Sequence, residues 1–565
     1  DLKNNIFKDQ NGDNLGTDFG GLDGTPDDDP NEDKAPDNFS NSYHGTHVAG
    51  IASAATNNGI GIASIGYNCK VLPVKASRDD RRNRDGYPYI YYGYEGIKYA
   101  VDMGAKVINC SWGGYAFSRY GQEIINYAIS KGSLVVAGAG NENSRLLFYP
   151  ASYVGVLSVG WLNTLSDSRN IMANHGIAVD VMAPGTSILS TWPTATGSYY
   201  RSINGSSMSS PLAAGLAGLI FSKYPHYTPD QVAERIRMTC DDISSENNTE
   251  EKYLLGRGRI NAGNALNKGS LISVRATKID FYDKGNGNGL FESGEVFDVV
   301  LTLTNYFRGI NHLNVSAITT DPNINIVLLP TSIGGIDSLQ TKENAYGFRI
   351  EISENAPINY EVITRIEFST DDYQDFQWFS IKLNPTYETH NANKIRMTVT
   401  SKGVVGFNDF LNNLEGDGFR FSDGGNLLFE GAFMYGISSA KLMDAARIET
   451  TQSADFITLK QVTIDRPGEV ADEQGYSAFS DDGAGQSKLG ITTEMHTYQF
   501  ANATDDNYII IGTELNNNTS QNINGLYAGW YFDWDMTEED HTDDMVGYDF
   551  QDNFDDAESL IPTYV

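Results

Sequence analysis

Residues 45–266 alternate between short apolar runs and helix-like stretches. The strand-like runs are 70–75, 106–110, 133–137, 156–159 and 179–182, and the helix-like stretches are 45–55, 93–103, 120–131, 209–223 and 229–239. Strands and helices in alternation predict a parallel sheet with helices on both faces. Ligands of such sheets bind outside the carboxyl ends of the strands.

The pattern changes after about residue 268. Helix-like stretches nearly vanish, and short alternating strands separated by Asn, Gly and Asp turns take their place, which is typical of a β-sandwich. A chain of 565 residues is also too long for one core. We therefore predict an α/β domain at 1–268, an immunoglobulin-like or fibronectin-like β-sandwich at 271–387, and a β-rich accessory domain at 388–565.

Charge and cysteine content restrict the class of protein. The formal net charge of −33 argues against binding nucleic acid or anionic membranes, because phosphates would be repelled. It suits an extracellular protein that holds cations between carboxylates. No stretch approaches the length of a membrane span. Three cysteines are too few, and odd in number, for a disulfide framework.

Two segments supply a base and a nucleophile. His44–Gly50 reads His-Gly-Thr-His-Val-Ala-Gly, and Asn204–Pro211 reads Asn-Gly-Ser-Ser-Met-Ser-Ser-Pro. Each stands at the head of a helix rich in small residues. A serine hydroxyl needs a base to become a good nucleophile, so Ser207 with His44 predicts acyl transfer by serine chemistry. The N–H of Ser207 would face an oxyanion at its helix head. The alternative for this segment is a serine-rich helix cap.

A third polar group follows an apolar strand. The run 135–142 ends in two glycines, Asn141 and a glutamate, at the sheet edge where ligands bind. An asparagine amide there can donate to a developing oxyanion, although a simple turn explains the same residues. The order His44, Asn141, Ser207 favours the catalytic function. His47 is predicted to be a buried structural histidine, since only one imidazole can meet Ser207; a zinc site on the two histidines has little support.

These segments, in this order, resemble the subtilisin-like serine proteases, or subtilases. The runs 149–151 (Tyr-Pro-Ala) and 181–185 (Val-Met-Ala-Pro-Gly) match that family as well. The resemblance covers residues 1 to about 268. It implies that the chain is a serine endopeptidase acting on protein or peptide substrates, with His44 as general base, Ser207 as nucleophile and Asn141 as oxyanion donor.

Substrate contacts follow from the same resemblance. The segment Ser111, Trp112, Gly113 and the next glycine resembles the family's Ser-Leu-Gly-Gly strand, which pairs with an extended peptide. The resemblance makes Gly138, Ala139 and Gly140 the other wall of the primary specificity pocket, with room for a large apolar side chain. Trp112 replaces the usual leucine, and we expect it either to reshape the neighbouring subsites or to pack in the core.

The aspartate that precedes the histidine in subtilases is missing. In the family it ends an apolar strand and precedes Ser/Thr-Gly, and no Asp between residues 9 and 37 does so. Asp1-Leu2-Lys3 matches a segment that follows it, so we expect it upstream of residue 1. A processed chain with a separate first strand, and a true pseudoenzyme, are the alternatives. The loss would cost about 10⁴-fold in kcat, so we expect this chain to be feeble and the full-length protein active.

The resemblance also implies a structural Ca²⁺ site. Its ligands would be the Asp1 carboxylate, the Asn58 amide oxygen and the carbonyl oxygens of Thr56, Ile60 and Ile62, an all-oxygen set that suits Ca²⁺. A simple turn is the alternative. The acidic runs 23–33 and 283–295 are further candidates for cation binding or for solvated loops. No organic cofactor is expected.

The accessory region, residues 388–565, resembles that of large secreted subtilases of Bacteroidetes type. Its aromatic run at 526–535 could bind glycans or pack in a sheet core. We therefore predict a secreted bacterial protein, extracellular or on the cell surface. The rival class is a surface adhesin or binding protein on a degenerate protease scaffold; nothing visible supports a peptide ligase. The oligomeric state is not indicated.

Overall fold

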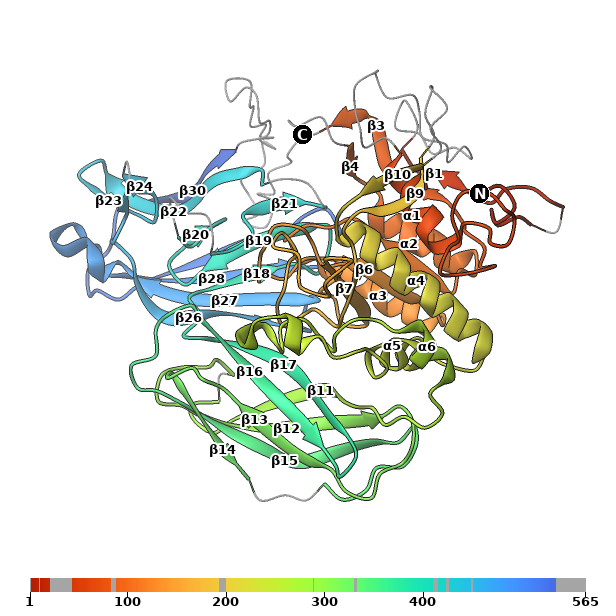
Figure 1. The fold of residues 1–565 in the computed structure, drawn as a ribbon. Coiled ribbons are helices and arrows are strands. Elements are labelled where there is room, and N and C mark those ends of the chain that lie inside the picture. The colour runs from red at the N-terminus through yellow and green to blue at the C-terminus, as the bar shows by residue number, and fades with distance from the viewer. Residues whose placement is uncertain are drawn as a thin grey trace. The chain divides into compact units, whose positions relative to one another are not determined.

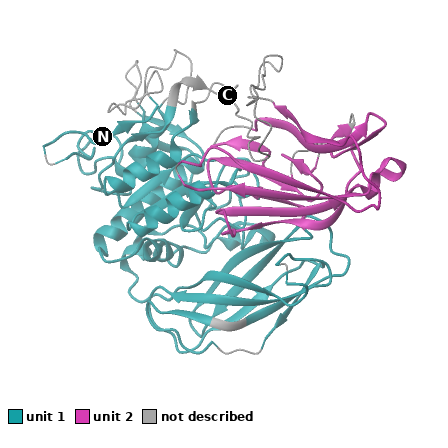
Figure 2. Cartoon of the chain, turned by 180° about the vertical axis from the view of Figure 1, so that it is seen from behind, with its two compact units in different colours: residues 1–384 teal, residues 385–565 magenta. Residues whose placement is uncertain are grey.

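The computed structural model describes residues 2–9, 11–20, 43–82, 88–192, 200–287, 289–329, 333–409, 415–422, 426–448, 451–502 and 504–534. The chain forms two compact units, residues 1–384 and residues 385–565 (Figure 2). The first unit contains an α/β part followed by a β-sandwich. The three-domain division remains a prediction.

A four-stranded parallel sheet forms the centre of the α/β part (Figure 1). Its strands, in spatial order, are β5 (Val107–Cys110), β6 (Leu134–Gly138), β7 (Val156–Leu162) and β8 (Val181–Pro184). All of β6 and β7 is buried, as expected for strands covered on both faces. The predicted α/β fold is therefore confirmed.

Helices cover both faces of this sheet. Val135 and Ala137 of β6 pack with α2 (Gly93–Asp102) and α3 (Arg119–Ser130). Leu134 and Val136 point to the opposite face and pack with the other helices, which are α4 (Ser206–Lys223), α5 (Pro229–Arg237) and α6 (Ala262–Asn267). Successive side chains of a strand point to opposite faces, so one apolar run builds two cores.

The remaining elements of the α/β part lie around this sheet. Helix α1 (His44–Ser53) contacts α4 and the hairpin of β9 (Ile188–Thr191) and β10 (Tyr200–Ile203). The short strands β1 (Thr17–Asp18) and β2 (Val74–Lys75) pair in parallel. Strands β3 (Ser77–Arg82) and β4 (Pro88–Ile90) pair antiparallel, and two short 3-10 turns occupy Ser244–Glu246 and Thr249–Glu251.

Two antiparallel sheets form the sandwich that follows. One has the order β11-β12-β15-β14 and the other β13-β16-β17. Their bounds are β11 (Val274–Asp283), β12 (Val296–Asn305), β13 (Asn314–Ile318), β14 (Ile324–Leu328), β15 (Thr341–Ile352), β16 (Tyr360–Ser369) and β17 (Gln374–Leu383). A single apolar core, including Phe297, Phe348 and Phe368, lies between the sheets.

A buried ionic cluster joins the α/β part to this sandwich. Arg237 at the end of α5 is 4% exposed, and its Nη2 donates to Asp375 of β17 over 3.2 Å. Its Nη1 donates to Glu234 over 2.7 Å. Burial alone would raise the pKa of Asp375, but Arg237 and two neighbouring guanidiniums hold it below its usual value. The sandwich is thus bonded to α5, the helix that follows the one carrying Ser207.

The second unit consists mainly of two further sheets with one apolar core between them. The first contains β18 (Tyr387–His390), β19 (Ile395–Thr400), β20 (Val404–Val405), β21 (Phe419–Phe421), β22 (Leu428–Ser438), β23 (Lys441–Asp444) and β30 (Tyr527–Trp534). The second contains β26 (Ile457–Asp465), β27 (Glu473–Ser480), β28 (Ile491–Gln499) and β29 (Ile510–Asn517). A short hairpin, β24 (Arg447–Ile448) with β25 (Thr451–Gln452), and a 3-10 segment at Asp481–Ser487 complete the unit.

The aromatic run of β30 divides between two environments. Trp530, Phe532 and Trp534 pack against the core of the second unit, whereas Tyr527 is 80% exposed. Three of the five aromatic side chains of β30 thus pack against the core, and Tyr527 and Tyr531 are exposed. None of the helices in the described part of the chain is both long and apolar enough to cross a membrane.

Removal of the buried cation should test the junction between the α/β part and the sandwich. We expect Arg237→Met to lower the free energy of unfolding by about 3 kcal/mol or more, because it leaves buried carboxylates without their main counter-charge. Urea titration followed by circular dichroism measures this loss. Lys98→Met breaks an exposed pair with Asp102 and should cost less than about 0.5 kcal/mol. Equal losses in the two variants would contradict the role of the cluster.

Candidate active site

Ser207 is the second residue of α4. The helix begins after Gly205, whose φ of +136° belongs to a conformation that L side chains rarely adopt. A Cβ on Gly205 would also lie 3.3 Å from the Asn141 Oδ1. Glycine therefore lets the turn before α4 approach the end of β6, which sets Ser207 at the sheet edge where ligands of parallel sheets bind.

Asn141 is held against the head of α4 by one hydrogen bond. The backbone N–H of Ser206 donates to Asn141 Oδ1 over 2.8 Å. The Nδ2 of Asn141 and the backbone N–H of Ser207 donate to none of the residues that the structure describes. Two donors without an acceptor thus lie beside the Ser207 hydroxyl, at the positive end of a helix dipole, as an oxyanion site requires.

The hydroxyl of Ser207 points to the end of β5. Its Oγ donates to the carbonyl oxygen of Ser111 over 3.3 Å, and the Ser111 hydroxyl donates to the carbonyl oxygen of Ser207 over 2.9 Å. This pair of bonds joins the predicted nucleophile to the predicted substrate strand. No hydrogen bond between Ser207 and His44 occurs among the described residues; in a protein without substrate such contacts are often long.

His44 is the first residue of α1, and two sets of contacts align α1 with α4. Ser190 and Thr191 of β9 donate to backbone carbonyls in the first turn of α1, and Gly185, just before β9, lies against Gly205. The other end of α1 lies against the middle of α4.

A second contact between α1 and α4 lies well along both helices from His44 and Ser207. At the far end of α1, the Ala52 carbonyl faces Gly215 of α4, where a Cβ would come within 3.1 Å of it. Contacts near both ends of α1 therefore hold this helix against α4.

The imidazole of His44 is half-buried and lacks an acidic partner in the described residues. Burial, followed by the charge of His47, lowers the pKa of His44 to about 4. Of the early aspartates that the structure describes, Asp18 is ion-paired with Lys75 at 2.7 Å and Asp9 accepts bonds from its own turn. Neither of these two carboxylates is bonded to His44 in the described residues, and the position of the missing acid stays a prediction.

His47 has the structural position that the sequence predicts. It is fully buried, and its Nε2 lies 2.9 Å from the carbonyl oxygen of Arg201 in β10. Its ring packs at 6.1 Å from that of Trp192. These contacts fix α1 on the β9–β10 hairpin. No group of three or more His, Cys, Asp or Glu in the described ranges is arranged to hold a metal ion.

The predicted substrate strand is partly open. Gly113 is exposed, and the backbone groups of Trp112 and Gly113 bond to none of the described residues, whereas Gly114 pairs with Tyr149 in both directions at 2.8 and 2.7 Å. The Trp112 ring packs at 5.8 Å from Tyr94 and covers Gly93, so it contributes to the core. Its effect on subsites stays a prediction.

The opposite wall, residues 138–140, is buried. Its two glycines allow neighbouring side chains to approach the backbone closely, a reason for glycine that the sequence did not reveal. A Cβ on Gly138 would lie 3.0 Å from the Ser206 hydroxyl, and one on Gly140 would lie 2.1 Å from the Asn174 amide. The Asn174 side chain also donates to the Ala139 carbonyl and accepts from the N–H groups of Glu142 and Ser144. Asn174 was missed by sequence reasoning, since no local pattern marks it.

Three further side chains join the two walls. The Tyr115 hydroxyl donates to Glu142 over 3.3 Å. This bond connects the end of the predicted substrate strand to the residue after Asn141. The Phe148 ring lies 5.2 Å from that of Tyr115 and occupies the space beside Gly113. Only Tyr115, which follows two glycines, has a local sequence signal; Glu142 and Phe148 have none of this kind.

The predicted calcium loop follows α1. Asn57, Gly59 and Gly61 have positive φ, and Asn58 Oδ1 accepts the N–H of Ile60 over 3.0 Å. Asp1 lies outside the described residues, but Asn5 donates to the carbonyl of Ser53 over 2.8 Å, which ties the segment after Asp1 to the end of α1. The acidic run 23–33 also lies outside the described residues. The donors of the loop are all oxygens, which fits a hard cation.

Known proteins match the part of the chain that contains these residues. The model of the subtilase family matches residues 13–258. The thermophilic serine proteinase of Bacillus sp. (strain AK1) is 40% identical over 223 residues, which are 40% of this chain and 52% of that protein. Thermitase of Thermoactinomyces vulgaris is 38% identical over 234 residues, which are 41% of this chain and 77% of thermitase.

A solved protease of Pseudoalteromonas arctica PAMC 21717 is 30% identical, covers 44% of this chain and 82% of its own, and has a TM-score of 0.39. The chain spans about half the length of the first curated relatives it matches. With the helix-borne histidine, the serine at the head of α4, the family match and the similarity to thermitase, the chain belongs to the subtilase family of serine peptidases.

Proposed function

We propose that this chain is the peptidase portion of a secreted serine endopeptidase. The observation that carries the proposal is the head of α4, where the Ser207 hydroxyl lies beside two donors without an acceptor in the described residues, its own N–H and Asn141 Nδ2. His44 would take the proton of Ser207 as its Oγ bonds to the scissile carbonyl carbon. The oxygen of that carbonyl becomes an anion and accepts from the two donors.

The second half of the reaction uses the same groups. Protonated His44 gives its proton to the leaving amine, and the acyl group remains on Ser207. A water molecule, deprotonated by His44, then attacks the ester and releases the acid. The substrate backbone would pair with the open segment at Trp112 and Gly113.

The contacts between the two walls of the specificity pocket limit the size of the substrate side chain that it can accept. The Tyr115–Glu142 bond and the Phe148 ring reduce the space between the walls, which argues against the large apolar side chain that glycine walls alone would allow. Secretion is supported by the acidic composition, with a net charge of −33.

A binding protein on a degenerate scaffold is the second candidate. One observation favours it: the described residues give His44 no carboxylate partner. Loss of that partner in triad proteases costs about 10⁴-fold in kcat. The two candidates differ in whether Ser207 reacts at all.

Covalent labelling of Ser207 separates them. We expect a fluorophosphonate to modify Ser207 slowly but specifically, as seen by mass spectrometry of the digested protein. Ser207→Ala should abolish the label, and Asn141→Ala should slow it by about 10²-fold, the low end of the loss that an oxyanion donor contributes in a subtilisin. Ser245→Ala, at an exposed serine, is the matched control. A folded protein without label after prolonged incubation would support the binding protein instead.

The pH dependence of labelling tests the environment of His44. The base acts only when neutral, and the pKa of His44 is lowered from 6.5 to about 4 by burial and by His47. The labelling rate should therefore stay constant as pH falls through 6.5 and decline only near pH 4. The exposed His226→Gln variant should show the same profile. A midpoint near 7 would contradict this and would indicate a carboxylate in contact with the imidazole.

We also propose that the loop at residues 56–62 binds a structural Ca²⁺. The ligands would be the Asn58 amide oxygen and the carbonyls of Thr56, Ile60 and Ile62, with the Asp1 carboxylate. Support comes from the all-oxygen donor set and from the Asn5–Ser53 bond that brings the N-terminal segment to this loop. The ion would stabilise the folded state by mass action.

Chelation tests this site. At a Ca²⁺ concentration about 100 times Kd, binding adds about 2.7 kcal/mol to the free energy of unfolding, so EDTA should lower the unfolding temperature by about 5 °C. Asn58→Ala should reduce the shift, whereas Asn68→Ala, at an exposed position just beyond this loop, should not. An unfolding temperature that does not respond to EDTA would remove the proposal.

A further inference from the structure

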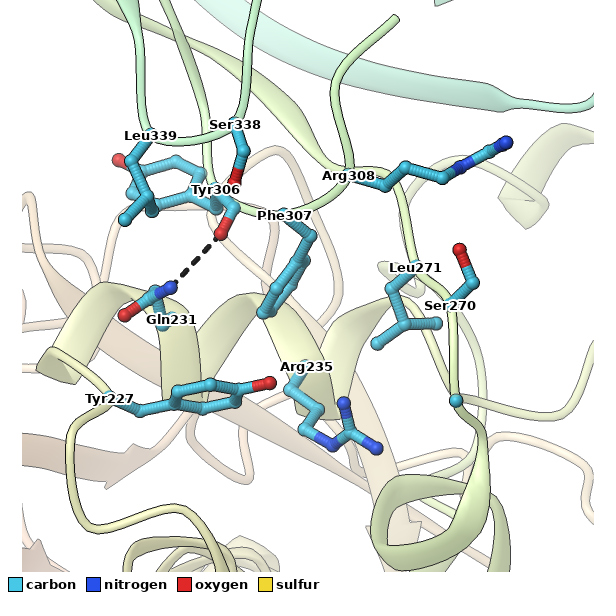
Figure 3. Close-up of a pocket in the computed structure, with 11 residues that line it drawn as sticks. Tyr227, Gln231, Arg235, Ser270, Leu271, Tyr306, Phe307, Arg308, Ser338 and Leu339 are labelled. Atoms are coloured by element: carbon cyan, nitrogen blue, oxygen red, sulfur yellow. Dashed lines mark hydrogen bonds between the residues drawn. The ribbon is translucent and has the colours of Figure 1, made fainter.

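A cavity of about 390 Å³ lies between α5 and the beginning of the sandwich, away from the head of α4 (Figure 3). Tyr227 and Arg235 come from the α/β part, and Leu271 and Phe307 from the sandwich side. Figure 3 shows Gln231 bonded to the Tyr306 carbonyl at one side of the space, over 3.0 Å. The volume falls within the range of about 300–1,000 Å³ that small-molecule sites occupy.

Arg235 is a buried cation on this cavity. Its side chain is 1% exposed, and its guanidinium donates to the backbone carbonyls of Ala265 and Lys268 and to the Tyr224 hydroxyl at 3.0 Å. All three acceptors are neutral. Its Nη1 donates to no described residue, and no carboxylate of the described chain forms an ion pair with it. A buried charge without a counter-charge is costly.

Arg237, two residues further along α5, is a second buried arginine with which Arg235 can be compared. It is 4% exposed and has Glu234 at 2.7 Å, Asp375 at 3.2 Å and Asp180 at 3.6 Å. The two guanidiniums are almost equally buried on one helix, yet among the described residues only Arg237 has carboxylate partners, whereas Arg235 donates to carbonyls at the C-terminal end of α6. In the described residues Arg235 therefore keeps a formal positive charge without a carboxylate beside it.

Aromatic rings form much of the wall beside this cation. The Arg235 guanidinium lies 4.4 Å from the Tyr224 ring, which stacks on Tyr227 at 4.7 Å. The Phe307 ring lies 5.7 Å from Tyr227. These rings offer apolar area to an organic body next to the charge. Arg308 at the rim already pairs with Asp372 at 2.5 Å, so it adds no second unpaired cation.

We propose that this cavity binds a small organic carboxylate with an aromatic body. The carboxylate would accept from Nη1 of Arg235, and the ring would lie on the cavity side of Tyr227, Phe307 and Leu271. One open cationic nitrogen suits a monoanion, whereas a phosphate carries more charge than the site can satisfy. The assignment is independent of the peptidase reaction.

Calorimetry with two matched probes tests this site on the full chain carrying Ser207→Ala. We expect 3-phenylpropionate to bind saturably with one site per chain, at least about tenfold more tightly than 3-phenylpropanamide, its neutral analogue. Arg235→Met should remove that preference. Lys223→Met, which deletes an exposed cation that does not line the cavity, should leave the affinity within about twofold.

A second variant keeps the test decisive if Arg235→Met fails to fold. Ser270→Trp fills the cavity from an exposed position and leaves the bonds of Arg235 intact, so it should abolish binding of 3-phenylpropionate. Equal affinity for the acid and the amide would overturn the proposal, as would unchanged binding in Ser270→Trp. Loss of labelling at Ser207 would bear only on the peptidase function, since binding is measured without that hydroxyl.

Discussion

The hydrogen bond from the Ser206 N–H to Asn141 Oδ1 is the contact on which the candidate active site depends. It turns the Asn141 amide so that Nδ2 is left as a donor, beside the Ser207 N–H. The bond forms because Gly205 lets the head of α4 approach the end of β6. Helix position, oxyanion donors and nucleophile are therefore set by one close approach, and a side chain at Gly205 would disturb all three.

The packing behind the site extends this constraint into the sandwich. Helix α4 packs on the sheet and on α5, and α5 carries two buried arginines with opposite surroundings. Arg237 meets carboxylates from its own helix and from β17, so the sandwich closes the ionic cluster that the α/β part leaves incomplete. Arg235 lines the cavity at the same junction, without a carboxylate partner among the residues that the structure describes. The sandwich therefore contributes to the stability of the unit that contains the candidate active site.

Most of the α/β fold was predictable because its signals are local. The strands of the central sheet and the helices α1–α5 fall within a few residues of the predicted runs, since apolar periodicity and glycine turns act over short spans. Ser207, His44 and Asn141 were identifiable for the same reason. Asn174, Tyr115, Glu142 and Phe148 were not, because their roles arise from contacts between loops that are distant in sequence.

The sequence by itself determined the fold class, the family resemblance and the three predicted catalytic side chains, because short segments encode helix heads and strand ends. Only the tertiary structure decided which side chains and backbone groups surround those residues. It showed that the glycines at 138 and 140 permit close packing, that Trp112 joins a core, and that His44 has a lowered pKa. Burial and charge at each of these positions come from segments that folding brings together, so no local pattern contains them.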